Sequence, residues 1–355
     1  MNKKETEVIL QRIEKWYNHL PTLFITDKQN FSAKFGWSKE PTSFSERLKL
    51  DYKSIKNGDE WGKKWESAWF HLKGQCPEDW DGDTVATELD FSGEGLVFDK
   101  DGKALQGLTN GSIWDPNFAR TRVQVVESCT KGEKIEIWVE AAANSLFGVF
   151  TDPDPEEESP KRHGWFDAKV ESLMFGKFDR NLWHLYLDVR ILRGMIKHLD
   201  KNSIQRARAI RALNDCINTF SDEQKNADKA RTCLQKELGK KSSASDLSVS
   251  AIGHAHIDTG WLWPVRETVR KCARTFATQL NIIDSYPNYI FGASQPQHYQ
   301  FMKDHYPEIY DRIKTAVKNG NWECQGGMWV EADCNLISGE SMVRQFIHGK
   351  NFFKD

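Results

Sequence analysis

Two histidines and an aspartate alternate directly after a short apolar run. The run Ser248–Gly253 leads into His254, His256 and Asp258. Alternate residues of an extended backbone point to the same side, so these three side chains would share one face. Imidazole and carboxylate donors on one face suit zinc or a similar divalent ion. The same side chains could instead satisfy loop hydrogen bonds, with Asp258 capping the next turn.

A second polar cluster follows the later run NWECQG, residues 321–326. Here Glu331 and Asp333 alternate in the same way. A carboxylate at this position could complete a metal site, act as a nucleophile or do both, or it could be a solvated or helix-capping residue. The neighbouring Cys334 has no basic residue poised to lower its pKa, so we interpret it as a passive thiol.

The elements that must position these clusters form the last of four predicted regions. The pattern predicts an N-terminal helical segment over 1–65, with helical patches at its start and around 45–55. Short β-rich runs separated by Gly, Asp and Pro predict an antiparallel β-sandwich over 66–175. Amphipathic runs predict three helices in a connector over 176–246. Alternating strands and helices over 247–355 then predict the start of an α/β barrel.

Two details of this division bear on the site. Parallel strands carry their active sites at the carboxyl ends, so both polar clusters should meet at one edge of the sheet. Three strands are too few to close a barrel, and we expect the chain to stop inside that domain.

Within the sandwich, 99–103 should form a hairpin turn and the acidic segment 152–158 a solvated connection.

Composition excludes several classes of protein. A net charge of −2 over 355 residues gives no excess of positive charge with which to bind nucleic acid. No apolar run is long enough for a membrane helix, and the N-terminus lacks the apolar core of a signal peptide. Seven cysteines without a CxxC pair indicate reduced thiols in a cytoplasmic protein. The 14 tryptophans slightly favour a carbohydrate-binding protein, since flat aromatic faces stack on sugars.

The polar clusters closely resemble those of a known enzyme family. The segments GHAHIDTGWLWP (253–264) and GGMWVEADCNLISGESMVRQF (326–346) resemble class II α-mannosidases of glycoside hydrolase family 38. The segment GLVFDKDGKALQGLTNGSIWDPNFAR (95–120) resembles the N-terminal domain of the cytosolic and vacuolar branch. The resemblance implies a (β/α)7-type barrel and metal-assisted, retaining hydrolysis of terminal α-linked mannose from oligosaccharides, through a covalent mannosyl-enzyme.

The resemblance also implies a role for each residue. His256, Asp258 and Asp333 would bind Zn²⁺, for which Co²⁺ could substitute, and Asp333 would be the catalytic nucleophile. Trp261 would form the floor under the mannose ring, and His254 would support the site through hydrogen bonds. The acid/base Asp and one further metal-binding His are expected beyond residue 355. We therefore expect this N-terminal fragment to be inactive alone, and the full-length protein could form homo-oligomers.

Two other functions fit the same sequence features. A metal-dependent amidohydrolase or deacetylase also places His and Asp donors at a strand end. A non-catalytic fragment that binds carbohydrate through its Trp-rich sandwich is the other alternative.

Overall fold

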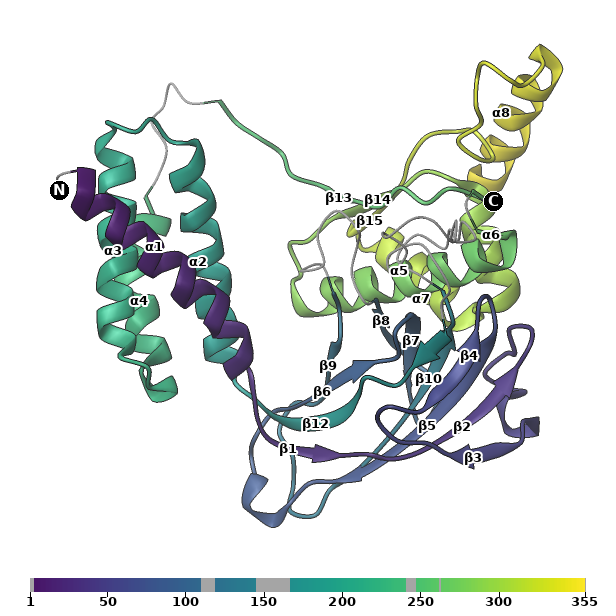
Figure 1. Cartoon of the computed structure of the whole chain (residues 1–355). Helices are drawn as coiled ribbons and strands as arrows, with labels where there is room; N and C mark the ends of the chain where they lie inside the picture. Colours follow the sequence, from purple (N-terminus) through teal and green to yellow (C-terminus); the bar gives the residue numbers. More distant parts are fainter. Residues whose placement is uncertain (1–2, 110–118, 145–166, 241–246, 262, 355) are drawn as a thin grey trace, which may run out of the picture.

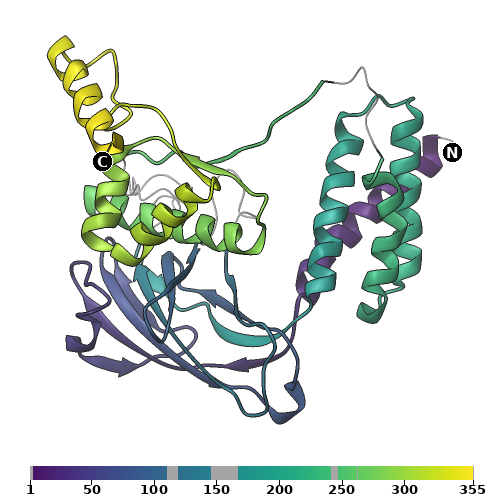
Figure 2. The ribbon, with the colours of Figure 1, turned by 180° about the vertical axis from the view of Figure 1, so that it is seen from behind.

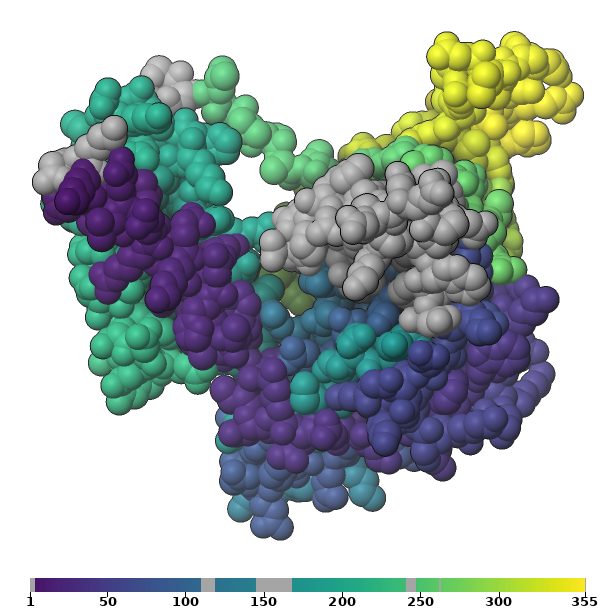
Figure 3. Space-filling model, in the orientation of Figure 1, coloured from purple at the N-terminus to yellow at the C-terminus, as the bar shows by residue number. Residues whose placement is uncertain are grey.

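The computed structural model describes residues 3–109, 119–144, 167–240, 247–261 and 263–354. Within them the chain forms a helical bundle, an antiparallel β-sandwich and a small α/β part (Figure 1). The bundle stands to one side of the sandwich, and the α/β part covers another side of it (Figures 1 and 3). No helix among the described residues is long and apolar enough to cross a membrane.

The bundle joins the start of the chain to the connector. Its helices are α1 (Lys3–His19), α2 (Arg180–His198), α3 (Ile204–Phe220) and α4 (Ala227–Leu238). Asp179 and Ser203 cap α2 and α3 by accepting hydrogen bonds from the backbone N–H groups of Leu182 and Arg206. The four helices share one apolar core, so the predicted connector helices are confirmed and pack with α1.

The predicted N-terminal helical segment over 1–65 is confirmed only at its start, in α1. A 3₁₀ turn at Leu20–Leu23 follows, and then the chain forms strands β1 (Ile25–Asn30), β2 (Ser32–Ser38), β3 (Tyr52–Ser54) and β4 (Glu60–Lys63). In the predicted patch around 45–55 only Arg47–Lys49 is helical, as a single 3₁₀ turn. The reason is tertiary pairing, because β3 hydrogen-bonds to β2, which in turn pairs along seven residues of β5.

The sandwich consists of two main antiparallel sheets. One has the order β1-β12-β6-β9 and the other β3-β2-β5-β10-β7-β8, while β4 pairs with β11. The remaining strands are β5 (Ser67–Gln75), β6 (Val85–Asp90), β7 (Glu94–Asp99), β8 (Ala104–Leu108), β9 (Arg122–Val126), β10 (Lys134–Ala142), β11 (Asp167–Lys169) and β12 (Ser172–Phe178). Side chains such as Phe70, Leu89 and Phe175 fill the core. The predicted antiparallel sandwich is confirmed, although its strands begin at Ile25.

The hairpin turn between β7 and β8 is also confirmed. The Asp99 carboxylate accepts from the N–H groups of Asp101 and Lys103, each at 2.9 Å. The acidic segment 152–158 lies outside the described residues.

The α/β part contains a three-stranded parallel sheet in the order β13-β14-β15. Its elements are β13 (Gly253–His254), β14 (Phe291–Ala293), β15 (Trp322–Cys324), α5 (Val265–Ser285), α6 (Pro296–His305), α7 (Pro307–Lys318) and α8 (Gly339–Lys354). The first strand is shorter than the predicted run 248–253, because only Gly253 and His254 have partners on β14. The parallel sheet agrees with the prediction, whereas the (β/α)7 barrel stays a prediction.

Helix α5 rests on the six-stranded sheet of the sandwich, as the view from behind shows (Figure 2). Trp69, Phe98 and Trp138 of the sandwich share one apolar core with Phe276 and Ala277 of α5. The α/β part that carries the polar clusters is thus packed directly on the sandwich.

Candidate active site

The first polar cluster lies on the loop between β13 and α5. His254 is separate from the others, because its Nδ1 lies 2.9 Å from the carbonyl oxygen of Gly292 on the neighbouring strand. His256 and Asp258 are in contact, with Nε2 3.1 Å from Oδ1. The predicted juxtaposition therefore holds for His256 and Asp258 and not for His254, which instead ties the loop to β14.

The second cluster reaches the first through Glu331. Its Oε2 lies 2.7 Å from Nδ1 of His256, and its other oxygen accepts a hydrogen bond from Ser294. Burial lowers the pKa of His256, but the hydrogen bond to Asp258 and the negative charge of Glu331 outweigh that effect and raise the pKa overall. The loops after β13 and β15 thus meet at one edge of the sheet.

Asp333 has a different environment. Its Oδ1 accepts from the N–H of Asn335 at 2.9 Å, and its carbonyl oxygen accepts from the N–H of Leu336. Within the described part of the chain, no three His, Cys, Asp or Glu side chains form a group that could hold a metal ion. His256 pairs with Asp258 and Glu331, whereas Asp333 accepts a hydrogen bond from the backbone of Asn335.

The predicted sugar platform, Trp261, is about half exposed, with 53% of its surface accessible. Its ring meets that of Trp263 edge to face, with centroids 5.1 Å apart. A solvent-accessible indole beside the His256 loop is compatible with stacking against a ring-shaped ligand.

A buried threonine that the sequence did not single out holds this loop in place. Thr268, on the first turn of α5, is fully buried. Its Oγ1 accepts from the N–H of Gly260 at 2.9 Å and from Nε1 of Trp263 at 3.0 Å, and donates to the carbonyl oxygen of Asp258 at 3.2 Å. A threonine inside an amphipathic helix gives no sequence signal for such a role.

A second buried group contacts the loop from α6. His298 Nε2 lies 2.8 Å from Oγ1 of Thr259. Burial lowers the pKa of His298 to about 4, so its ring is neutral near pH 7. His298 thus supports the loop as a neutral hydrogen-bonding group.

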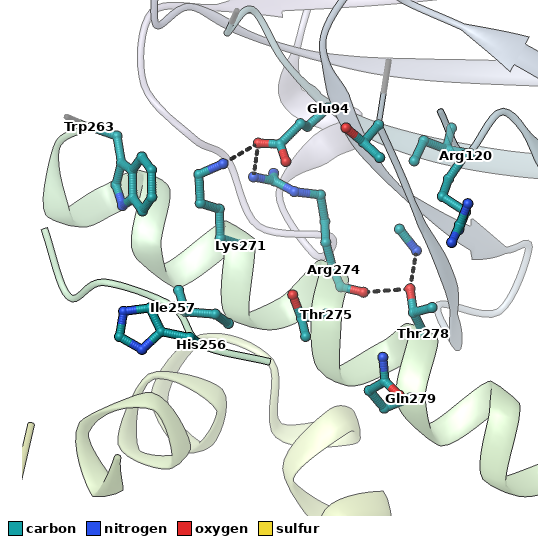
Figure 4. Close-up of a pocket in the computed structure, with 13 residues that line it drawn as sticks. Glu94, Arg120, His256, Ile257, Trp263, Lys271, Arg274, Thr275, Thr278 and Gln279 are labelled. Carbon is teal, nitrogen blue, oxygen red and sulfur yellow. Dashed lines mark hydrogen bonds and ion pairs between the residues drawn. The ribbon is translucent and has the colours of Figure 1, made fainter. Parts of the chain in front are cut away.

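A pocket of about 330 Å³ opens beside His256 between the loop, α5 and the sandwich (Figure 4). On its wall the Glu94 carboxylate binds Lys271 at 2.7 Å and Arg274 at 2.8 Å. Burial alone would raise the pKa of Glu94, but these two cations more than offset it and lower the pKa to about 2. Since Glu94 belongs to β7, the sandwich forms part of the surface next to the candidate site.

Two segments of the chain match the domains of known protein families. Residues 246–355 match the N-terminal domain of the glycosyl hydrolases of family 38. Residues 29–169 match the jelly roll domain of α-mannosidases. The chain belongs to glycoside hydrolase family 38. In this family member the matched jelly roll corresponds to the sandwich, and the match to the family 38 N-terminal domain covers the His256 loop.

Individual relatives match nearly the whole chain. Alpha-mannosidase G of Dictyostelium discoideum is 34% identical over 371 residues, covering 99% of this chain and 33% of that protein. Alpha-mannosidase 2C1 of Homo sapiens is 32% identical, covering 99% of this chain and 34% of that protein. Alpha-mannosidase of Saccharomyces cerevisiae is 29% identical over 86% of this chain. The chain thus spans about one third of the length of the first two relatives.

Membership of family 38 implies a metal-dependent enzyme. The donors on the His256 loop fit such an ion by chemical type, because imidazole nitrogen and carboxylate oxygen suit zinc and related divalent ions. His256 and Asp258 already lie within hydrogen-bond distance of each other at a partly exposed position.

Proposed function

We propose that this chain forms part of a retaining α-mannosidase that removes terminal α-linked mannose from oligosaccharides. The observation that carries the proposal is the contact of His256 with Asp258 and Glu331, at the edge of a parallel sheet, within the family 38 match. We also propose a cytoplasmic location and leave homo-oligomer formation as a prediction for the whole protein.

In this proposal His256, Asp258 and Asp333 would hold the metal, zinc by donor type, with cobalt fitting the same donors. When bound, such an ion supplies Lewis-acid chemistry and orients sugar hydroxyl groups. Trp261 would place its exposed indole under the mannose ring, and His254 would keep the loop on β14 through Gly292.

Asp333 would act as the nucleophile. Its carboxylate attacks the anomeric carbon, the glycosidic C–O bond breaks, and a second carboxyl group donates a proton to the leaving oxygen. Water activated by that second group then releases mannose with its anomeric configuration retained. We propose that the 355-residue chain alone is inactive, since it spans about one third of the length of the first two relatives.

We propose that Asp333 reorients for this role, because its Oδ1 accepts from the backbone of Asn335 while His256 contacts Asp258 and Glu331. Rotation about its side-chain torsions would exchange this single hydrogen bond for contacts in the loaded site. A hydrogen bond from a backbone N–H to a carboxylate contributes about 1.5–3 kcal/mol, which the new contacts of the carboxylate in the loaded site would offset.

The test is hydrolysis of an aryl α-mannoside by the longest gene product that contains this chain. We expect activity to be lost on chelation and in Asp333→Asn, and to be kept in the control Asp311→Asn, whose side chain is exposed on α7. NMR of the first product should show retained configuration. A metal-loaded protein that does not hydrolyse the aryl α-mannoside would contradict the proposal and favour an amidohydrolase or deacetylase.

A further inference from the structure

One buried amide connects the two loops of the candidate site. Gln295 follows β14, the middle strand of the parallel sheet, and occupies the N-cap position of α6, where its side chain makes no capping hydrogen bond. Only 3% of its surface is exposed. Its Nε2 donates to the carbonyl oxygen of Ile257 at 2.9 Å, and its Oε1 accepts from Thr259 Oγ1 at 3.0 Å and from the N–H of Glu331 at 3.2 Å.

We propose that Gln295 is a positioning residue that fixes the loop after β13 against the loop after β15. It would thereby set the spacing between the candidate ligands His256 and Asp258 and the candidate nucleophile Asp333. The inference rests on the proposed function for its catalytic consequence, but the structural link itself does not.

The sheet order explains why the link comes from this position. The loops of the outer strands β13 and β15 flank the end of β14, so a side chain just after β14 can reach both. Ile257 and Thr259 lie on either side of Asp258, and Glu331 lies two residues before Asp333. Movement of Gln295 would therefore displace both polar clusters together.

Hydrogen bonding defines one orientation of the amide. If the amide flipped, its NH₂ group would face the N–H of Glu331 and its oxygen would face the carbonyl oxygen of Ile257. Both contacts would then be repulsive at a buried site, where unpaired polar groups are costly. A residue of the same length without an amide cannot make this connection.

The first variant is Gln295→Met, which keeps the length of the side chain and removes all three hydrogen bonds. In the longest gene product that contains this chain, we expect kcat for an aryl α-mannoside to fall about 10- to 100-fold with little change in KM, as when groups that orient an active site are lost. The matched control is Tyr299→Phe on the same helix. It removes buried hydrogen bonds to Ala293 and Trp322 but touches neither loop, so we expect lower stability with kcat unchanged.

A second variant tests the link from the loop side. Thr259→Val removes one of the three Gln295 bonds together with the contact to His298, and it keeps the shape of the side chain. In a double-mutant cycle with Gln295→Met, the combined loss in kcat should be smaller than the product of the single losses. If Gln295→Met does not fold, Thr259→Val is measured in its place. A kcat within twofold of the parent would then overturn the proposal, since this variant loses the bond to Gln295 as well as the contact to His298.

A readout without catalysis separates this inference from the proposed function. Gln295→Met should speed hydrogen–deuterium exchange in peptides covering 255–261 and 328–336, whereas Tyr299→Phe should leave both at the parent rate. This result would support the link even in a protein that does not cleave mannosides. Equal exchange in the parent and Gln295→Met would overturn the link itself. A Gln295→Met protein that loses stability but keeps its kcat would overturn the catalytic consequence.

Discussion

The buried arginine that attaches α5 to the sandwich offers a sharp test of the energetics. Arg270 is 2% exposed and donates to the carboxylate of Glu267, to Ser67 Oγ at 2.8 Å and to the carbonyl oxygen of Ala141 at 3.4 Å. Glu140, whose pKa is raised by burial, is also stabilised in its charged form by Arg270. Replacing Arg270 by Met would leave buried carboxylates without their cation.

The expected loss in the free energy of unfolding follows from the burial of Arg270. Removing one partner of a buried ion pair typically lowers the free energy of unfolding by about 3–5 kcal/mol, because the other charge stays uncompensated. Arg266, four residues earlier on α5, pairs with Glu40 at 37% and 58% side-chain exposure. For Arg266→Met we therefore expect a loss below about 1 kcal/mol.

Urea-induced unfolding of the two variants, followed by fluorescence, measures this difference. Adding Glu267→Gln to Arg270→Met should recover part of the loss, since the double variant no longer buries an unpaired Glu267 carboxylate. Equal losses for Arg270→Met and Arg266→Met would refute the reasoning. They would mean that burial adds nothing to the strength of this contact.

Three further predictions use other contacts. Thr268→Val should lower the free energy of unfolding by about 1–3 kcal/mol because it leaves buried loop groups unpaired, while Thr268→Ser should cost much less in the same urea assay. The pKa of Glu94 is about 2 when folded, so its stabilisation is present above about pH 4.5 and disappears as the pH falls toward 2. Unfolding free energies of Glu94→Gln across that range should show a pH dependence smaller by about 3 kcal/mol. Gly107→Ala should lower the melting temperature, since its Cβ would meet Arg274 at 2.8 Å, whereas Gly194→Ala should raise it by adding helix propensity in open space.

Periodicity predicted the elements that bury one face. The helices α2 to α4 follow a 3.6-residue apolar spacing, and their shared core explains why that pattern was informative. Strand β1 could not be found in this way. In ITDKQN only Ile25 is buried, and the strand exists because its backbone pairs with β12.

Some contacts of the candidate site could likewise be predicted from the sequence, and others could not. Alternation predicted the contact between His256 and Asp258, since it depends on neighbours in the sequence. The contact of His256 with Glu331, and the supports from Thr268 and Gln295, depend on the packing of α5 and α6. Single-sequence patterns carry no information on those distances.

The core shared by α5 and the sandwich has a consequence for how such proteins can be divided. The two family matches end and begin at residues 169 and 246, as if they were separate modules. Yet Trp69, Phe98 and Trp138 are buried against the α/β part. A sandwich produced alone would present this aromatic surface to water and should self-associate. In the course of evolution the two modules could then be exchanged only as a pair.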